Sequence, residues 1–183
     1  MLTLTLAHTA DLDVAALRAV RALLDDVFDG AFGDDDWDHA RGGVHVLLTG
    51  DNGLVTGDDG LVGHAAVVAR RLLHAGRALR TGYVEGVAVH RSHRRRGHGG
   101  TLMAAAERVV RGGYDLGALS ASAEALAFYR GRGWLPWTGP ASALTPDGVR
   151  PTPDEDSLHV LPVGVPVDPA GELTCDWRDG DLW

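Results

Sequence analysis

The spacing of hydrophobic residues predicts an alternation of strands and helices from the first residues onward. Every second residue from Leu2 to Leu6 is leucine, with threonines between them, which is typical of a strand with one buried face. Apolar residues then recur at steps of three and four from Val14 to Phe28, behind aspartates that can cap a helix. This alternation indicates a mixed α/β fold, and the chain length suits a single domain over 1–183.

The rest of the chain continues the alternation, with turn-forming segments between the elements. Residues 50–60 hold two turn signals and predict a long hairpin tip, whereas residues 139–156 are rich in proline and glycine and predict a loop. Gly82 and Gly86 interrupt a predicted strand, which suggests a bulge or a close backbone approach. The C-terminal segment is expected to be extended, after a last strand. Further strands are predicted over 44–48, 61–73, 78–89, 116–120, 134–137 and 158–163, with helices over 101–111 and 123–130 and a short one near Trp37.

Charge and composition narrow the classes of ligand. The chain has 25 acidic and 17 basic residues, and the formal net charge of -8 disfavours nucleic acids and anionic membranes and favours a small cation. All 17 basic residues are arginines. Because the sequence contains no lysine, it excludes P-loop nucleotide binding, protein-kinase chemistry and Schiff-base chemistry, which all need that residue.

Cysteine usage and the N-terminal pattern bear on the cellular compartment. Cys175 is the single cysteine, so the chain can form neither an internal disulfide nor a cysteine-rich zinc site. The N-terminus lacks the basic region and apolar run of a signal peptide, and no stretch reaches the roughly 18 apolar residues of a membrane span. These features predict a soluble, cytoplasmic protein.

An arginine- and glycine-rich segment follows the predicted strand over 78–89 and leads into the next predicted helix. Residues 94–99 have the pattern Arg-x-x-Gly-x-Gly. Guanidinium groups, backbone amides made accessible by glycine and the amide end of a helix all attract anions. The segment therefore predicts an anion site, with a pyrophosphate as the expected ligand.

Other ligands agree less well with this segment. The dinucleotide fingerprint Gly-x-Gly-x-x-Gly fails, because Leu102 stands three residues after Gly99. A nucleic-acid patch would be expected to include aromatic residues and to lie on a basic chain. His90, His93 and His98 lie among arginines that would repel a metal cation, so we expect no metal site. An ordinary solvated charge run remains, and the placement of the glycines favours the anion site over it.

The pattern over 94–99 resembles the acetyl-CoA pyrophosphate loop of the GCN5-related N-acetyltransferase (GNAT) superfamily. Nearly the whole chain is similar to the aminoglycoside 2'-N-acetyltransferases of mycobacteria and related bacteria. The strings that carry this resemblance are HTADLD, DDWDH, GYVEGVAV, RGGYDLGALS, FYRGRGWLPW, PTPDED and ELTCDWRDGDLW. The resemblance implies a GNAT acyl-CoA acyltransferase fold, a mixed and mostly antiparallel sheet flanked by helices, in a homodimer.

The resemblance also implies the catalytic groups and the acetyl-CoA contacts. Glu85 corresponds to the general base, which in the family usually acts through water, and Tyr129 to the residue that serves the departing thiolate. An ammonium must lose a proton before it can attack. From the residues alone, Glu85 is either a structural or a functional acid, and Phe128 and Tyr129 can be core aromatics. By resemblance, acetyl-CoA contacts Val87, Ala88, Val89, Arg94, Arg95, Arg96, Gly97, His98 and Gly99.

Carboxylates are the expected partners of an aminoglycoside, because these sugars carry several amines. Acidic residues gather over 34–38, 154–156 and 176–181, although each group alone can be a solvated loop. The family's terminal carboxylate corresponds to that of Trp183, which is expected to be ionised, to orient an amine and to count among the catalytic groups. By resemblance, the substrate contacts are Asp36, Glu85, Gly86, Ser120, Asp154, Glu155, Asp181 and Trp183, with Asp34 as a candidate.

Together these observations predict direct transfer of acetyl from acetyl-CoA to the 2'-amine of an aminoglycoside, in a ternary complex and without a metal. Two alternatives remain open. The first is a GNAT enzyme for another small amine, such as a polyamine or an amino sugar. The second is an inactive acetyl-CoA-binding sensor, which the presence of both Glu85 and Tyr129 disfavours.

Overall fold

The computed structural model of the chain describes residues 1–54, 60–153 and 157–183. Internal contacts divide it into two compact units, unit 1 with Met1–Val68 and Val84–Arg108 and unit 2 with Ala69–Tyr83 and Val109–Trp183. Among the described residues, no helix is long and apolar enough to cross a bilayer. The single domain expected over 1–183 stays a prediction.

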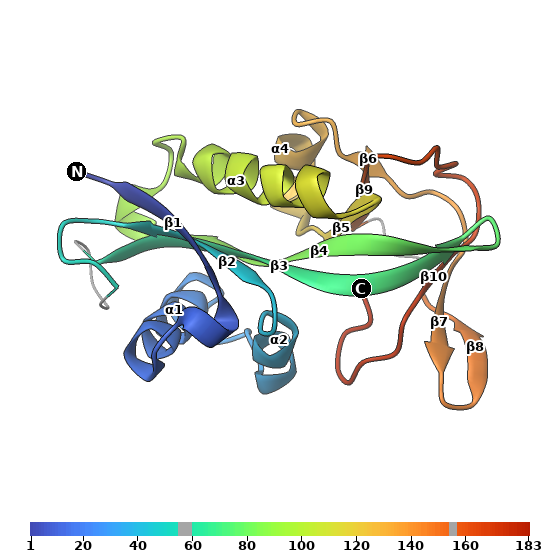
Figure 1. The fold of residues 1–183 in the computed structure, drawn as a ribbon, viewed down its shortest axis with the longest axis horizontal. Helices are drawn as coiled ribbons and strands as arrows, with labels where there is room; N and C mark the ends of the chain where they lie inside the picture. Colours follow the sequence, from blue (N-terminus) through green and yellow to red (C-terminus); the bar gives the residue numbers. More distant parts are fainter. Residues whose placement is uncertain (55–59, 154–156) are drawn as a thin grey trace. The chain divides into compact units, whose positions relative to one another are not determined.

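Unit 1 consists of an antiparallel sheet with helices on both faces (Figure 1). Its elements are β1 (Thr3–His8), η1 (Thr9–Asp11), α1 (Val14–Val27), α2 (Asp34–His39), β2 (Val44–Thr49), the first part of β3 (Leu61–His74), the last part of β4 (Arg77–Val89), η2 (Arg91–His93) and the first part of α3 (His98–Gly113). The strand order is β1-β2-β3-β4. Figure 1 shows α1 and α2 on one face of these strands and α3 on the other.

Helix α1 forms because a cap and an apolar stripe act together. The side chain of Asp13 accepts a hydrogen bond from the amide of Ala16 at 2.7 Å, which satisfies one of the free amides at the helix start. Val20 and Leu24 are fully buried one turn apart. They pack in a cluster with residues of β2, β3 and β4, such as Ala88, and burial of each large aliphatic side chain stabilises the fold by about 1.5–3 kcal/mol. The helix predicted from periodicity is confirmed.

The predicted first strand is confirmed as β1, but its predicted buried face is wrong. Leu2 and Leu4 are 38% and 39% exposed. The reason is that β1 is the edge strand of unit 1 and, among the strands that the structure describes, pairs with β2 alone. The core cluster under α1 draws its strand residues from β2, β3 and β4, so it does not cover these leucines.

Unit 2 is a mixed sheet in which most strand pairs are antiparallel. Its strand order is β6-β9-β5-β4-β3-β10-β7-β8. Among the described residues, parallel pairing occurs between β4 and β5, where Thr81 is opposite Leu116, and between β10 and β7. The added elements are β5 (Leu116–Ser120), η3 (Ala123–Ala125), α4 (Leu126–Arg130), β6 (Leu135–Pro136), β7 (Ala141–Thr145), β8 (Gly148–Pro151), β9 (Leu158–Pro162) and β10 (Leu173–Cys175).

Three predictions fail in unit 2. The loop expected over 139–156 contains the hairpin of β7 and β8, the last strand expected over 158–163 is followed by β10, and the strand expected over 134–137 is reduced to two residues in β6. These short strands depend on partners distant in sequence, since β10 lies between β3 and β7. Three residues are too few to show a periodicity. Residues 154–156 of the predicted loop, and 55–59 of the predicted hairpin tip, lie outside the described residues.

Two histidines are fully buried on the α1 face of unit 1 and belong to a chain of hydrogen bonds. Thr9 Oγ1 lies 2.8 Å from His45 Nε2, His45 Nδ1 lies 2.9 Å from His64 Nε2, and His64 Nδ1 lies 2.8 Å from the carbonyl oxygen of Gly86. Burial lowers the pKa of His45 to about 4 and that of His64 to about 3, helped in the first case by the charge of His8 and in the second by that of His45. Both rings are therefore neutral at physiological pH.

Neutral burial of His45 and His64 predicts that the protein loses stability in mild acid. A histidine whose pKa is lower in the folded state stabilises the fold above its unfolded pKa, near 6.5, and this contribution falls as the pH drops towards the folded value. We expect the free energy of unfolding, measured by urea titration, to fall by about 1 kcal/mol per histidine between pH 7.5 and pH 5.5, above the range of ordinary carboxylates. A free energy that stays constant over this range would contradict the neutral pair.

Candidate functional site

The last part of β4 carries the central group of predicted site residues. Glu85, Gly86 and Val87 are half-buried, between the buried Val84 and Ala88. The φ angle of Gly86 is +56°, a left-handed conformation that is rare within a strand and favours glycine. The positive φ favours glycine here more than the space does, because a Cβ atom at Gly86 would lie at an ordinary contact distance, 3.4 Å, from the His64 ring and from Leu24.

Backbone groups beyond Gly86 are directed to alternate sides of β4. The amide of His90 donates to the carbonyl of Val62 on β3 at 2.8 Å, whereas the carbonyl of Val89 accepts from Nε of Arg94 at 3.3 Å. In an antiparallel ladder this alternation directs the peptide groups of Val87 and Val89 away from β3. Within unit 1, β4 is an edge strand, so its backbone can pair with an extended ligand.

The arginine- and glycine-rich segment links β4 to α3 and contains two residues with positive φ. Arg95 has φ +61° and Gly97 has φ +84°. Backbone in such turns directs successive amides to one side and forms an anion-binding concavity. A left-handed arginine costs about 1 kcal/mol or more, and such strain is typical of functional sites. The side chains of Arg94, Arg95 and Arg96 are exposed.

Helix α3 begins at His98, three residues before its predicted start. The first helical hydrogen bond that joins it to the loop runs from the amide of Thr101 to the carbonyl of Gly97, at 3.1 Å. His98 and Gly99 therefore belong to the first turn, where amides carry the positive end of the helix dipole. This position strengthens the sequence argument for an anion at residues 94–99.

Arg91, in the same arginine cluster, has a structural role. Its Nε lies 3.3 Å from Asp26 Oδ2, and its Nη2 bonds both to the side chain of Asp29 and to the backbone carbonyl of Asp26. These partners raise the pKa of Arg91, with Asp29 as the largest cause. The guanidinium therefore fixes the loop to the end of α1. Within this cluster, the three arginines of 94–96 remain to bind an anionic ligand.

The nearby histidines do not form a metal site in the part of the chain that the structure describes. Rings of His90, His93 and His98 follow one another at centroid distances of 6.2 and 6.1 Å. No group of three or more His, Cys, Asp or Glu side chains there could hold a metal ion. The expectation that the site uses no metal stays a prediction.

Tyr129 belongs to unit 2, where α4 buries it. Its ring contacts those of Phe128 and Trp134 at centroid distances of 5.1 and 6.2 Å. Burial raises the pKa of Tyr129 to about 12, although the charge of Arg132 lowers it slightly. The phenol therefore keeps its proton at neutral pH, as a hydrogen-bond donor must.

The C-terminal segment of unit 2 is held by a buried arginine. Arg70 donates through Nε to Asp176 Oδ1 at 2.7 Å and through another guanidinium nitrogen to the carbonyl of Leu182 at 2.8 Å. The buried ring of Trp183 donates through Nε1 to Thr152 Oγ1 at 2.9 Å. Asp176 therefore belongs to an internal ion pair, and it is not among the residues predicted to contact the substrate.

Several of the remaining acidic positions also have internal partners. Asp36 accepts from the amide of Gly33 at 2.7 Å and so caps its own helix, while Asp34 pairs with Arg21 at 3.0 Å.

In unit 2, the hydroxyl of Ser120 donates to Ser157 at 3.0 Å. Asp181 is exposed, and its backbone carbonyl accepts from Arg178. Asp154 and Glu155 lie outside the described residues. Substrate contacts at all these positions stay predictions.

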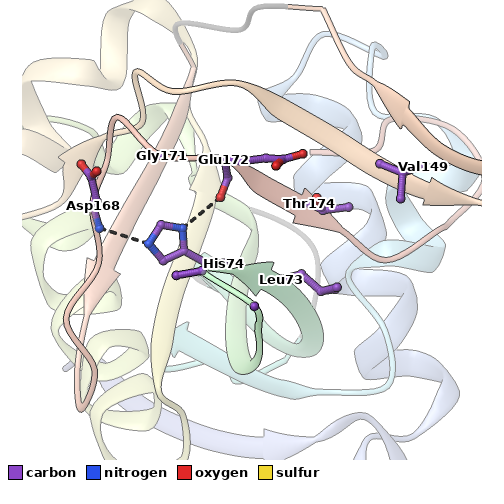
Figure 2. A pocket seen from close by; sticks show the side chains of 9 residues that line it. Leu73, His74, Val149, Asp168, Gly171, Glu172 and Thr174 are labelled. Carbon is purple, nitrogen blue, oxygen red and sulfur yellow. Dashed lines mark hydrogen bonds between the residues drawn. The ribbon is translucent and has the colours of Figure 1, made fainter.

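A pocket of about 440 Å³ in unit 2 lies beside the turn between β3 and β4 and contains none of the predicted site residues (Figure 2). Asp168 and Glu172 are the two acidic residues among those that line it. Figure 2 shows that both ring nitrogens of His74 are engaged, Nε2 by the amide of Asp168 at 3.1 Å and Nδ1 by the carbonyl of Glu172 at 2.9 Å. His74 is thus a structural residue that ties this turn to the segment before β10.

Comparisons with known proteins agree with this geometry. A family model described as an acetyltransferase (GNAT) domain matches residues 11–136. An aminoglycoside 2'-N-acetyltransferase of Mycolicibacterium fortuitum is 49% identical, over 99% of this chain and 92% of its own length.

Solved structures share the fold at lower identity. ElaA of Escherichia coli is 21% identical with a TM-score of 0.59, over 87% of this chain and 97% of its own. A variant of the toxin AtaT, solved with the C-terminus of the antitoxin AtaR and acetyl-CoA, is 17% identical with a TM-score of 0.56, over 88% and 92% of the two chains. The predicted mixed α/β fold is confirmed, and the chain belongs to the GNAT family of N-acetyltransferases.

Proposed function

We propose that this enzyme transfers the acetyl group of acetyl-CoA to the 2'-amine of an aminoglycoside. The observation that carries the substrate is the 49% identity, over nearly the full chain, with a protein named for that reaction. The observation that supports acetyl-CoA is local to unit 1. A strand edge for an extended ligand is followed by exposed arginines, left-handed backbone and a helix start, which together suit a pyrophosphate.

The acetyl-CoA contacts are proposed from these features. The outward backbone groups of Val87 and Val89, on either side of Ala88, pair with the extended arm of the cofactor, and the amide of Val87 donates to the thioester oxygen. Arg94, Arg95 and Arg96 provide charge, and the amides of Gly97, His98 and Gly99 provide hydrogen bonds to phosphate oxygens. Residues 94–99 all belong to unit 1, so this half of the proposal rests on described local geometry.

The chemical step needs a proton acceptor and a proton donor. Glu85, half-buried in a mostly apolar strand, accepts the proton that the 2'-ammonium must lose, directly or through water. The amine nitrogen then bonds to the acetyl carbon, the carbon–sulfur bond breaks, and the nitrogen loses a second proton, which replaces the one that Tyr129 gives to the sulfur. Tyr129, whose pKa burial raises from its ordinary value to about 12, carries a proton at neutral pH and donates it to the departing sulfur. Neither a covalent acyl-enzyme nor a metal takes part.

Carboxylates and backbone groups are proposed to bind the sugar amines. Exposed Asp181 and the acidic positions around 154–156 are the best candidates by charge, and Glu85 and Trp183 are further proposed contacts. Asp34, Asp36, Gly86, Ser120, Asp154 and Glu155 complete the proposed set. The single buried cysteine suits a reducing cytoplasm, and the homodimer rests on the resemblance to the family.

The reaction is tested by following free CoA release from acetyl-CoA with a panel of aminoglycosides with and without a 2'-amine. We expect turnover with the members that carry this amine, and mass spectrometry should place one acetyl group there. Equal turnover on members without it would contradict the regiochemistry. Turnover on polyamines alone would indicate another small amine as the substrate, and no turnover with any amine would favour an acetyl-CoA-binding sensor.

Glu85 as the base is tested by the change to Gln. We expect kcat at neutral pH to fall by about 100-fold or more, because general base catalysis typically contributes 10²–10⁴-fold, and the fall in rate towards acid pH to disappear. Glu124→Gln, which removes the same charge from an exposed position, is the control and should leave the profile unchanged. A Glu85→Gln enzyme with the native rate and pH profile would exclude this role.

The phosphate loop is tested by the double change of Arg94 and Arg96 to Ala. We expect the Kd for acetyl-CoA, measured by calorimetry, to rise by about tenfold or more, because two charge-assisted hydrogen bonds are lost at an exposed site. The double change of Arg18 and Arg150 to Ala alters the net charge equally at exposed positions and should leave the affinity unchanged. Unaltered affinity in the first variant would show that the loop does not bind the cofactor.

A further inference from the structure

We propose that His64 is a positioning residue for acetyl transfer, which acts by holding and polarising the peptide group between Gly86 and Val87. This inference rests on the proposed function, in which the amide of Val87 donates to the thioester oxygen. His64 contacts neither substrate in this proposal. It acts through the carbonyl of Gly86, with which it shares a hydrogen bond of 2.8 Å.

One peptide group connects the buried histidine with the proposed oxyanion donor. The carbonyl of Gly86 and the amide of Val87 belong to the same planar unit, and the described chain has no cis peptide bond. In a trans peptide the carbonyl and the amide N–H are directed to opposite sides. Because His64 holds the carbonyl, the N–H of Val87 is directed away from His64. If the hydrogen bond from His64 to the carbonyl changes, the direction of the N–H of Val87 therefore changes as well.

The irregular backbone conformation at Gly86 needs a hydrogen bond to stabilise it. Its φ of +56° turns the peptide out of the regular ladder of β4. His64 meets the turned carbonyl from β3, on the face where Leu24 of α1 is packed, and a Cβ at Gly86 would lie 3.4 Å from both side chains. The ring is fully buried, so water does not compete for this hydrogen bond.

The hydrogen-bond chain behind His64 has one possible direction when its rings are neutral. A carbonyl can only accept, so His64 Nδ1 carries the proton and Nε2 accepts from His45 Nδ1. His45 Nε2 then accepts from the hydroxyl of Thr9 at 2.8 Å, in preference to the longer 3.2 Å contact of that hydroxyl with Gly43. Each bond in such a chain strengthens the next.

The group at the end of the hydrogen-bond chain indicates whether the chain relays protons or orients a peptide group. Proton relays end on groups that titrate, such as carboxylates or imidazoles, whereas this chain ends on the carbonyl of Gly86. Withdrawal of electrons through the carbonyl makes the amide at the other end of the peptide a better donor. Burial of two imidazoles costs more desolvation free energy than burial of leucines of similar volume. The hydrogen bond that they provide to Gly86 therefore explains why histidines occupy these positions.

The first test concerns the tautomers of the wild-type enzyme and needs no ligand. In nitrogen-15 NMR of histidine-labelled protein, we expect His45 and His64 both to be protonated at Nδ1 and unprotonated at Nε2. An Nε2-protonated form of His64 would overturn the proposal, because Nδ1 could not then donate to Gly86. This measurement remains decisive even where a variant does not fold.

The second test compares three variants by kinetics and by infrared spectroscopy of bound acetyl-CoA with a carbon-13 label at the acetyl carbonyl. His64→Leu removes the donor, and His64→Asn keeps an N–H at the position of Nδ1. His74→Leu is the matched control, since His74 is also buried with both ring nitrogens bonded to backbone but lies in unit 2.

We expect the bound carbonyl band of the wild type to lie below that of free acetyl-CoA, as a polarised carbonyl requires. In His64→Leu the band should return towards the free position and kcat should fall by about tenfold, the effect of about one hydrogen bond, while the KM for acetyl-CoA changes by less than about twofold. His64→Asn should restore most of both effects. His74→Leu should keep the native band and kcat per folded molecule.

The outcomes separate this inference from the function on which it rests. An unshifted band and a native kcat in His64→Leu would overturn the role of His64 and leave acetyl transfer intact. An equal loss in His64→Leu and His74→Leu would reduce the effect to general stability and overturn it as well. Absence of acetyl transfer by the wild type would instead contradict the proposed function itself.

Discussion

The local structure of β4 at Gly86 is the constraint on which the rest of unit 1 depends. A left-handed glycine interrupts the strand, and a buried hydrogen-bond chain from Thr9 through His45 and His64 holds its carbonyl. The chain contacts β2, β3 and β4, so it also ties these strands to one another. Beyond this point the peptide groups of β4 alternate between β3 and the open edge, and the strand leads directly into the arginine-rich loop.

Charge in this protein divides into groups that hold the fold and groups that remain exposed. Arg91 and Arg70 are both committed to internal partners, as are Asp36 and Asp176. Such pairs explain part of the arginine and aspartate content without a ligand. The arginines of 94–96 are instead exposed, in a loop with left-handed backbone at Arg95 and Gly97 before a helix, where fixed amides reinforce their charge. The net charge of -8 alone does not reveal this division.

Long periodic elements were predictable, whereas short strands were not. The stripe of α1 and the runs that form β3 and β4 are long enough to show their period, and they lie close to the predicted bounds. The β7–β8 hairpin and β10 are strands because of the neighbours they pair with. Leu2 and Leu4 have the pattern of a buried face but belong to an edge strand that the core cluster does not cover.

By itself, the sequence determined the fold class, the family resemblance and the candidate residues, because these depend on residue types at fixed spacing along the chain. Tertiary structure alone decided which of those residues are already occupied, since the partners of Arg91, Asp34 and Asp176 are distant in sequence. It also decided that His45 and His64 form one chain that ends on Gly86. Hydrogen bonds depend on direction and on exclusion of water, and neither is encoded in local spacing.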